Sequence, residues 1–149
     1  MRWVLKHSTT QLHYWKLEEN ETDAELKYNK EAHSLRIIAD VRRLFFIERT
    51  GFLQHKFLLK TEYSLIAGEI YTSKNWNSGI TVFEGKKFTY SLKENILTLS
   101  SKKDHQVFVI QIDSQELLNQ FEFCALLWGS LKILCRTYTI TTNAILARH

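Results

Sequence analysis

Three pairs of adjacent basic residues carry the clearest chemistry in this sequence. The pairs are Arg42–Arg43, Lys86–Lys87 and Lys102–Lys103. The two lysine pairs fall at expected turns, which we expect to lie at one end of the fold. Each basic side chain near an anionic surface contributes about 1 kcal/mol of attraction, and two converging pairs could hold a phosphate head group. The sequence therefore predicts ligand-binding residues at Arg42, Arg43, Lys86, Lys87, Lys102 and Lys103.

Paired lysines also have an ordinary structural role. They keep a chain soluble and protect the edges of β-sheets from pairing with other strands. The residue types alone favour this role over a ligand site. The net charge of +4 suits some attraction to anionic partners, but it is lower than in a committed nucleic-acid binder. We therefore expect no nucleic-acid partner and keep the anion site as a hypothesis.

The histidines and glycines form no pattern typical of a metal site or a catalytic site. The six histidines never occur as His-x-His or His-x-x-x-His, and a zinc site needs three or four converging ligands. No Gly-x-Ser-x-Gly turn presents a nucleophile. The five glycines are isolated, whereas loops that cradle phosphate need several. We expect scattered surface histidines, no metal, no cofactor and no enzymatic activity.

A dense acidic segment is the other candidate for ion binding. Its carboxylates are Glu18, Glu19, Glu21, Asp23 and Glu25. Such a cluster could hold calcium, but no glycine supplies the sharp turn of an EF-hand loop and the spacing of the oxygens does not fit one. We expect a solvated loop here.

The two cysteines indicate a reducing compartment. Cys124 and Cys135 lie eleven positions apart, which on one helix is about 16 Å along the axis. A disulfide needs Cα atoms within about 7 Å of each other, so we expect two buried free thiols. The segment Met1–His7 lacks the apolar core of a secretory signal. A cytoplasmic location follows, peripheral to a membrane if the basic pairs bind lipid.

Most of the chain has the pattern of short β-strands. Nine Phe, six Tyr and four Trp favour strands. Residues 87–93 alternate polar and apolar strictly, as a half-buried strand does. Similar runs, Tyr63–Tyr71 among them, follow one another up to position 112. Their spacing predicts about nine to twelve antiparallel strands over residues 2–112.

The pattern changes to that of a helix after Asp113. From Glu116 to Lys132 there is no Val, Ile or Thr. Asp113 and Glu116 have the spacing of a capping box. We predict a helix over residues 114–135, with a short strand or tail over 136–149. A β-hairpin turning at Trp128–Ser130 is the alternative.

The predicted helix has no polar face. Between Phe123 and Cys135 the strongly polar residues are Ser130 and Lys132, which point to opposite sides at 100° per residue. Such a helix is either buried on all sides or spans a membrane. A span needs about 20 apolar residues, and this run is shorter and contains a lysine. Because no second helix is available, we expect one domain, residues 1–149, in which an antiparallel β-barrel wraps around a hydrophobic C-terminal helix.

Three segments carry a resemblance to a known family: Phe46–Gly51, Tyr63–Ile70 and the helical stretch Phe121–Cys135. A barrel around a hydrophobic C-terminal helix resembles the tubby C-terminal-like superfamily, which includes tubby-like proteins, LURP-one-related proteins and phospholipid scramblases. This chain departs from tubby in continuing beyond the helix. The resemblance implies a connection with lipids, since tubby-like members bind phosphoinositides and scramblases act on lipids, but it identifies no particular binding residue here.

The expected function follows from these observations. We expect a non-catalytic module that binds an anionic lipid or a phosphorylated ligand on the surface of the barrel. The alternative is a protein-interaction or structural domain with no small-molecule ligand.

Overall fold

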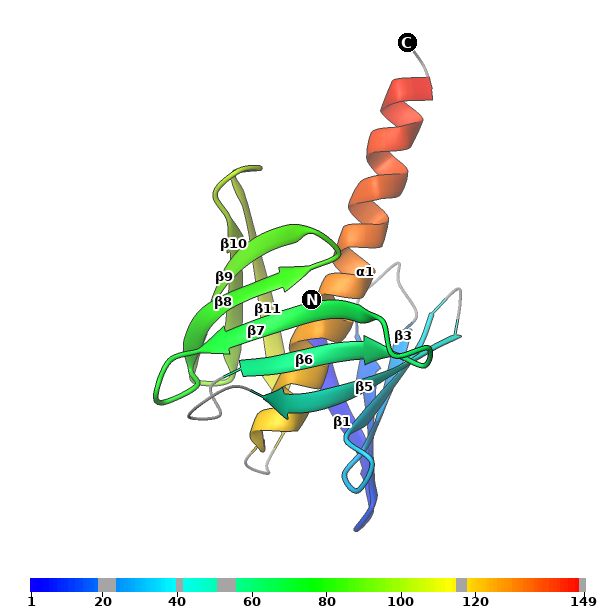
Figure 1. Cartoon of the computed structure of the whole chain (residues 1–149). Coiled ribbons are helices and arrows are strands. Elements are labelled where there is room, and N and C mark those ends of the chain that lie inside the picture. Colours follow the sequence, from blue (N-terminus) through cyan, green and yellow to red (C-terminus); the bar gives the residue numbers. More distant parts are fainter. Residues whose placement is uncertain (19–23, 40–41, 51–55, 115–117, 148–149) are drawn as a thin grey trace.

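The β part of the computed structural model is a closed barrel of eleven strands (Figure 1). The structure describes residues 1–18, 24–39, 42–50, 56–114 and 118–147, with side chains of the helix up to position 134. The strands are β1 (Arg2–Ser8), β2 (Leu12–Leu17), β3 (Ala24–Asn29), β4 (Ser34–Ile38), β5 (Arg42–Thr50), β6 (Lys56–Thr61), β7 (Ile66–Thr72), β8 (Ser78–Phe83), β9 (Lys86–Lys93), β10 (Ile96–Ser101) and β11 (Gln106–Asp113).

Each strand pairs with its neighbours in the sequence, and the last strand meets the first. All pairs from β1–β2 to β10–β11 are antiparallel, and β1 closes the ring by pairing with β11 in parallel, with Trp3 opposite Ile112. Inward positions alternate with outward ones, as in Leu97 and Leu99, which are buried, and Thr98 between them. Closure leaves no free sheet edge. The predicted fold class is therefore confirmed.

One helix, α1 (Gln120–Ala147), runs through the barrel (Figure 1). At about 1.5 Å per residue its length is roughly 42 Å. Every residue from Glu122 to Leu131 is buried, so all sides of this stretch face protein. Inward aromatic side chains of the strands, such as Trp15 and Tyr28, complete the core around it.

The boundaries of the helix differ from the predicted ones. The helix begins at Gln120, and Asn119 caps it by accepting a hydrogen bond from the Glu122 N–H at 2.8 Å. Asp113, the predicted cap, ends β11 and forms an ion pair with Arg2, while Glu116 lies outside the described residues. The alternative hairpin at 128–130 is wrong, because these residues are helical.

The predicted C-terminal strand is also absent. Residues 136–147 continue α1, so the expectation of a strand or tail over 136–149 is wrong for this stretch. The reason is the closure of the barrel by β1 and β11. A further strand would find no unpaired neighbour there, whereas a helix satisfies its backbone groups internally.

Two glycines allow the helix and the barrel to approach closely. A Cβ atom on Gly129 of α1 would lie 2.6 Å from Cδ1 of Leu26, far inside the contact distance. A Cβ atom on Gly68 of β7 would lie 2.9 Å from Nε1 of Trp128. Glycine destabilises a helix by about 1 kcal/mol relative to alanine. Position 129 is nevertheless glycine because the site has no room for a side chain.

We predict that truncations on different sides of α1 all destabilise the protein. Leu127, Trp128 and Leu131 are fully buried. Leu→Ala at such sites costs about 2–5 kcal/mol and Trp→Ala about 3–5 kcal/mol, out of a total of about 5–15 kcal/mol. Leu127→Ala, Trp128→Ala and Leu131→Ala should each lower the melting temperature measured by circular dichroism.

Lys132 provides the matched control within the helix. Its ammonium group lies 2.6 Å from Oε1 of Glu84, and both side chains are partly exposed. Such pairs contribute only about 0–1 kcal/mol, so Lys132→Met should change the melting temperature little. Stability that survives Leu127→Asp or Leu131→Asp would contradict the enclosure of the helix.

Candidate functional site

One end of the barrel collects the predicted basic residues. Consecutive strands run in opposite directions, so successive turns alternate between the two ends. The turns β4–β5, β6–β7, β8–β9 and β10–β11 therefore share one end. The helix starts at the opposite end and leaves here, where Lys132 meets Glu84 of the β8–β9 turn (Figure 1). We call this the exit end.

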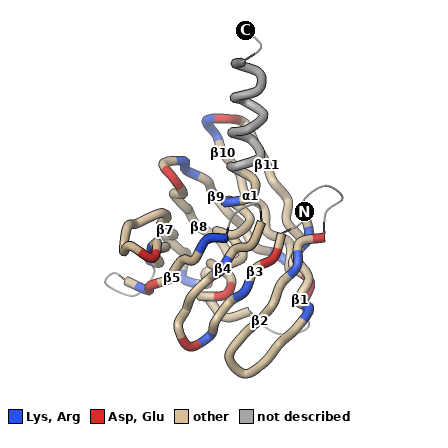
Figure 2. The backbone as a smooth tube through the Cα atoms, turned by 90° about the vertical axis from the view of Figure 1, so that its right-hand side faces the viewer, with Lys and Arg blue, Asp and Glu red and all other residues tan. Residues whose placement is uncertain are grey.

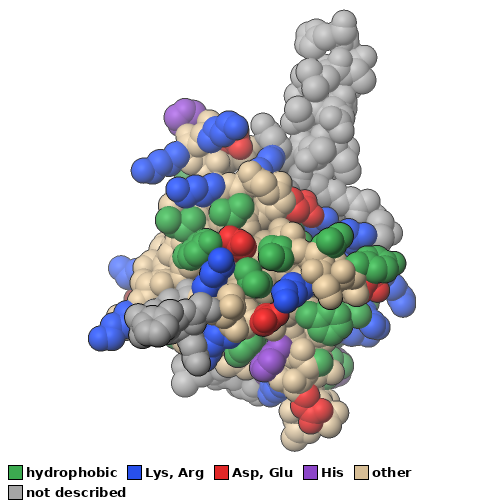
Figure 3. All heavy atoms as spheres, in the orientation of Figure 1, with side chains coloured by type: hydrophobic (Ala, Val, Ile, Leu, Met, Phe, Trp, Pro, Cys, Tyr) green, Lys and Arg blue, Asp and Glu red, His purple; other side chains and the backbone are tan. Residues whose placement is uncertain are grey.

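The two lysine pairs come together at the exit end. Lys86 and Lys87 begin β9, and Lys102 and Lys103 follow β10. Since Thr89 pairs with Ser100, Lys87 and Lys102 each lie two residues beyond this pair on neighbouring strands. These four residues form the lysine patch. Figure 2 shows basic residues at the tips of both hairpins, and Figure 3 shows basic side chains gathered at the upper left of one face.

The arginine pair lies at the same end but not in the lysine patch. Arg42 and Arg43 begin β5 and are exposed. Strands β6, β7 and β8 lie between β5 and β9 in the ring. The six predicted residues therefore form two basic groups on one rim.

The lysine patch contrasts with several lysines elsewhere on the outer surface, which face carboxylates. These are Lys6 with Glu18 at 3.0 Å, Lys60 with Glu48 at 2.6 Å, and Lys56 with Glu69 at 3.8 Å. Among the residues that the structure describes, Lys87, Lys102 and Lys103 have no such ion pair, and all three are exposed. Their positive charge is therefore available to an anion.

The outer surface of β8–β11 is free of charge between the strand ends. Its outward side chains are Ser78, Ile80, Val82, Thr89, Ser91, Thr98, Ser100, Val107 and Val109. Ladder pairs such as Ser100–Val107 and Ile80–Thr89 join them into rows. Each strand from β1 to β7 carries at least one charged outward residue, as Arg36 on β4 does. We call the β8–β11 surface the uncharged wall.

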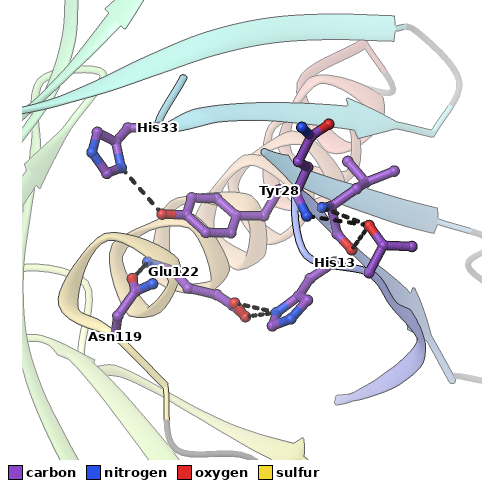
Figure 4. Close-up of polar contacts among 8 residues, drawn as sticks. His13, Tyr28, His33, Asn119 and Glu122 are labelled. Atoms are coloured by element: carbon purple, nitrogen blue, oxygen red, sulfur yellow. Dashed lines mark hydrogen bonds and ion pairs between the residues drawn. The ribbon is translucent and has the colours of Figure 1, made fainter. Parts of the chain in front are cut away.

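The sequence did not predict a polar cluster that lies inside the barrel at the end where the helix starts (Figure 4). His13 of β2 is 4% exposed and Glu122 of α1 is 2% exposed. Nδ1 of His13 faces both carboxylate oxygens of Glu122, with Oε2 at 2.7 Å. Nearby, the Tyr28 hydroxyl lies 3.3 Å from Nδ1 of His33, and burial raises the pKa of Tyr28 to about 12.

This cluster fastens the first turn of the helix to the barrel. The His33 ring stacks on Phe121 at 3.8 Å between centroids, and Gln120 accepts a hydrogen bond from Arg49 of β5. The carboxylate and imidazole of the Glu122–His13 pair face each other inside the protein, so they hold α1 in place. The expectation that all histidines lie on the surface is wrong for His13. Its alternation with buried Trp15 and Leu17 could have indicated the inward position.

Cys124, Cys135 and the acidic segment are the remaining candidate ligands. Cys124 is a buried free thiol, as expected, and burial raises the pKa of its thiol well above the usual range. The side chain of Cys135 lies outside the described residues. Within the described ranges, no group of three or more His, Cys, Asp or Glu residues could hold a metal ion. Of the acidic segment, Glu18 pairs with Lys6, and residues 19–23 lie outside the described part.

Comparison with known proteins leaves the family open. The chain matches no protein-family model, no curated protein and no solved structure. The resemblance to the tubby C-terminal-like superfamily therefore stays a prediction. No helix in the described part of the chain is both long enough and apolar enough to cross a membrane.

We predict that breaking the His13–Glu122 pair destabilises the protein strongly. Removing one member of a buried pair leaves the other uncompensated, at a cost of about 3–5 kcal/mol. Glu122→Gln and His13→Gln should each lower the free energy of unfolding, measured by urea denaturation. The double variant His13→Phe with Glu122→Leu should lose less than the two single variants added together. Single variants as stable as the parent would show that the pair does not fasten the helix.

Proposed function

We propose that this chain is a non-catalytic module that binds the phosphate groups of anionic lipids at a membrane surface. The observation that carries the proposal is the lysine patch. Two hairpins bring four lysines to one rim, and three of them are exposed without an ion pair among the described residues. Phosphate head groups offer the complementary charge.

The arrangement of the basic groups favours a lipid surface over a small soluble ligand. The lysine patch and the Arg42–Arg43 pair share the exit end but are separated by β6, β7 and β8. A small phosphorylated molecule can meet one of these groups, whereas an extended anionic surface can meet both. Because each exposed basic residue contributes about 1 kcal/mol, binding depends on several contacts and weakens with salt.

Two further considerations support a non-catalytic role at the membrane. Cys124 is enclosed and the His13–Glu122 pair is buried, so these reactive groups do not meet a substrate at the surface. The resemblance to a superfamily with lipid-binding members points in the same direction. Anionic lipids are concentrated in the cytoplasmic leaflet, where a peripheral cytoplasmic protein meets them.

We predict that reversing two charges of the lysine patch strongly weakens binding to anionic vesicles. Lys87→Glu with Lys102→Glu removes two attractive charges and adds two repulsive ones. The affinity for phosphatidylcholine vesicles containing phosphatidylserine or a phosphoinositide should fall by more than roughly 30-fold. Co-sedimentation at low and high salt measures the loss, and the melting temperature should stay unchanged.

The matched control is Lys27→Glu with Arg36→Glu. These residues are also basic neighbours on adjacent strands, since Lys27 pairs with Arg36 between β3 and β4. The control changes the net charge equally but should keep most of the binding. If it loses as much as the lysine variant, net charge and not the patch drives the binding. A parent protein that ignores anionic vesicles even at low salt would remove the proposal.

The second candidate function is protein docking, with no small-molecule ligand. It is favoured by the uncharged wall, where exposed Val107 and Val109 lie on β11 among serine and threonine side chains. Such a surface suits packing against another protein better than contact with phosphate. A photo-crosslinking residue at Val109 should then form protein adducts in cells, whereas one at Lys27 should not. If a crosslinker at Lys103 forms lipid adducts and one at Val109 forms no protein adducts, the result would support lipid binding and contradict protein docking.

A further inference from the structure

The turn between β6 and β7 exposes large apolar side chains at the exit end. Tyr63 is 80% exposed, Leu65 66% and Ile66 58%. We call these three residues the apolar turn. Phe46 of β5 lies in the same row of outward side chains, since it pairs with Lys60, which pairs with Ile66. Neighbouring apolar side chains exposed in this way are typical of an interaction site.

The fold does not need these side chains. Thr61 fixes the turn: its N–H donates to the Leu65 carbonyl at 2.8 Å, and its carbonyl accepts from the Ser64 N–H at 3.0 Å. Its hydroxyl oxygen also lies 3.2 Å from the Leu65 nitrogen, which donates to it. Ser64 adopts a positive φ of 63°. The backbone and Thr61 thus determine the shape of the turn, and the apolar side chains are left facing water at a cost of about 25 cal/mol per Å².

Basic residues lie next to the apolar turn. Phe45 pairs with Thr61, so Arg43 and Tyr63 each lie two residues beyond this pair at the exit end. Figure 1 shows the start of β5 beside the β6–β7 turn. Arg42 and Arg43 are both exposed, and Glu62 is the acidic residue of the turn. Among the described residues of these two strand ends, two arginines therefore stand against one carboxylate.

We propose that the apolar turn inserts into the interfacial layer of an anionic lipid bilayer while Arg42 and Arg43 bind the phosphates around it. A bilayer is anionic at its surface and apolar beneath, which matches arginines placed beside a projecting apolar tip. Tyrosine prefers the head-group level, leucine and isoleucine gain by leaving water, and arginine pairs with phosphate in two-point contacts. This inference rests on the proposed function and adds a contact that salt does not screen.

The test uses Tyr63→Trp as a reporter of depth. Trp3, Trp15 and Trp128 are fully buried and Trp76 is partly buried, so the new indole is the exposed one among the described residues. With vesicles of phosphatidylcholine and phosphatidylserine, its emission should shift to the blue, and lipids brominated on the acyl chains should quench it. The matched control is Tyr71→Trp, at the other end of β7 and also exposed, which should show neither change.

A second variant separates this inference from the proposed function. Leu65→Ser with Ile66→Ser should keep the parent's melting temperature and lose at least roughly tenfold in affinity at every salt concentration. Electrostatic attraction should still hold the variant on vesicles at low salt, whereas its binding should disappear at high salt, where the parent still binds. Glu62→Gln should strengthen binding. If Leu65→Ser with Ile66→Ser binds like the parent at high salt, or the Tyr63→Trp reporter is not quenched on vesicles that bind, insertion is wrong and the lysine patch stands alone. If the parent binds no anionic vesicles, both proposals fail.

Discussion

A helix that is apolar on every side leaves water only if other segments surround it, and polar atoms brought inside with it are costly unless they find hydrogen-bond partners there. Two chains of hydrogen bonds provide such partners for two tryptophan side chains. The Trp128 indole N–H donates to the Thr81 hydroxyl at 3.2 Å, which donates to the Glu69 carbonyl at 2.8 Å. The Trp3 indole N–H donates to the Ser130 hydroxyl at 2.8 Å, which donates to the Leu126 carbonyl at 2.7 Å. Each hydroxyl serves as acceptor and donor, so both indoles are satisfied without water.

Enclosure also decides where a partner can bind. The helix and the inward aromatic side chains occupy the interior, so the residues available for recognition lie on the wall and at the two ends. The end where the helix starts carries the buried Glu122–His13 pair, whose carboxylate and imidazole are directed at each other. The exit end carries the lysine patch and the arginine pair instead. One end thus fastens the helix, while the other brings the adjacent basic residues of the sequence to one rim.

The sequence predicted the features that depend on side-chain periodicity. Alternation along residues 87–93 matched β9, and the apolar run from Phe123 onward correctly indicated an enclosed helix. Features that depend on tertiary partners were missed. Nothing in the predicted helix of residues 114–135 singled out Glu122, because its partner, His13, is more than a hundred positions away and is brought to it only by the fold. Tyr63 and Leu65 were taken as part of a strand, because nothing in their types shows that Thr61 closes a turn there.

The order of the antiparallel strands explains why the basic residues lie at one end of the barrel. In a barrel built from consecutive antiparallel hairpins, turns separated by two strands lie at the same end. The turns β4–β5, β8–β9 and β10–β11 are separated from one another by even numbers of strands. Each of them adjoins one of the basic residues Arg43, Lys87 and Lys102. The barrel therefore brings these residues to one rim, although they are far apart in the sequence. The rule determines at which end of the barrel a residue lies, but not its position around the rim, which depends on the number of intervening strands. The two hairpins that carry the lysines are neighbours, because β9 pairs with β10. Arg43 lies farther around the rim, because β6, β7 and β8 stand between β5 and β9. A contact surface wide enough to meet both groups must therefore extend across the rim, which is why an extended anionic surface fits this end better than a single small ligand.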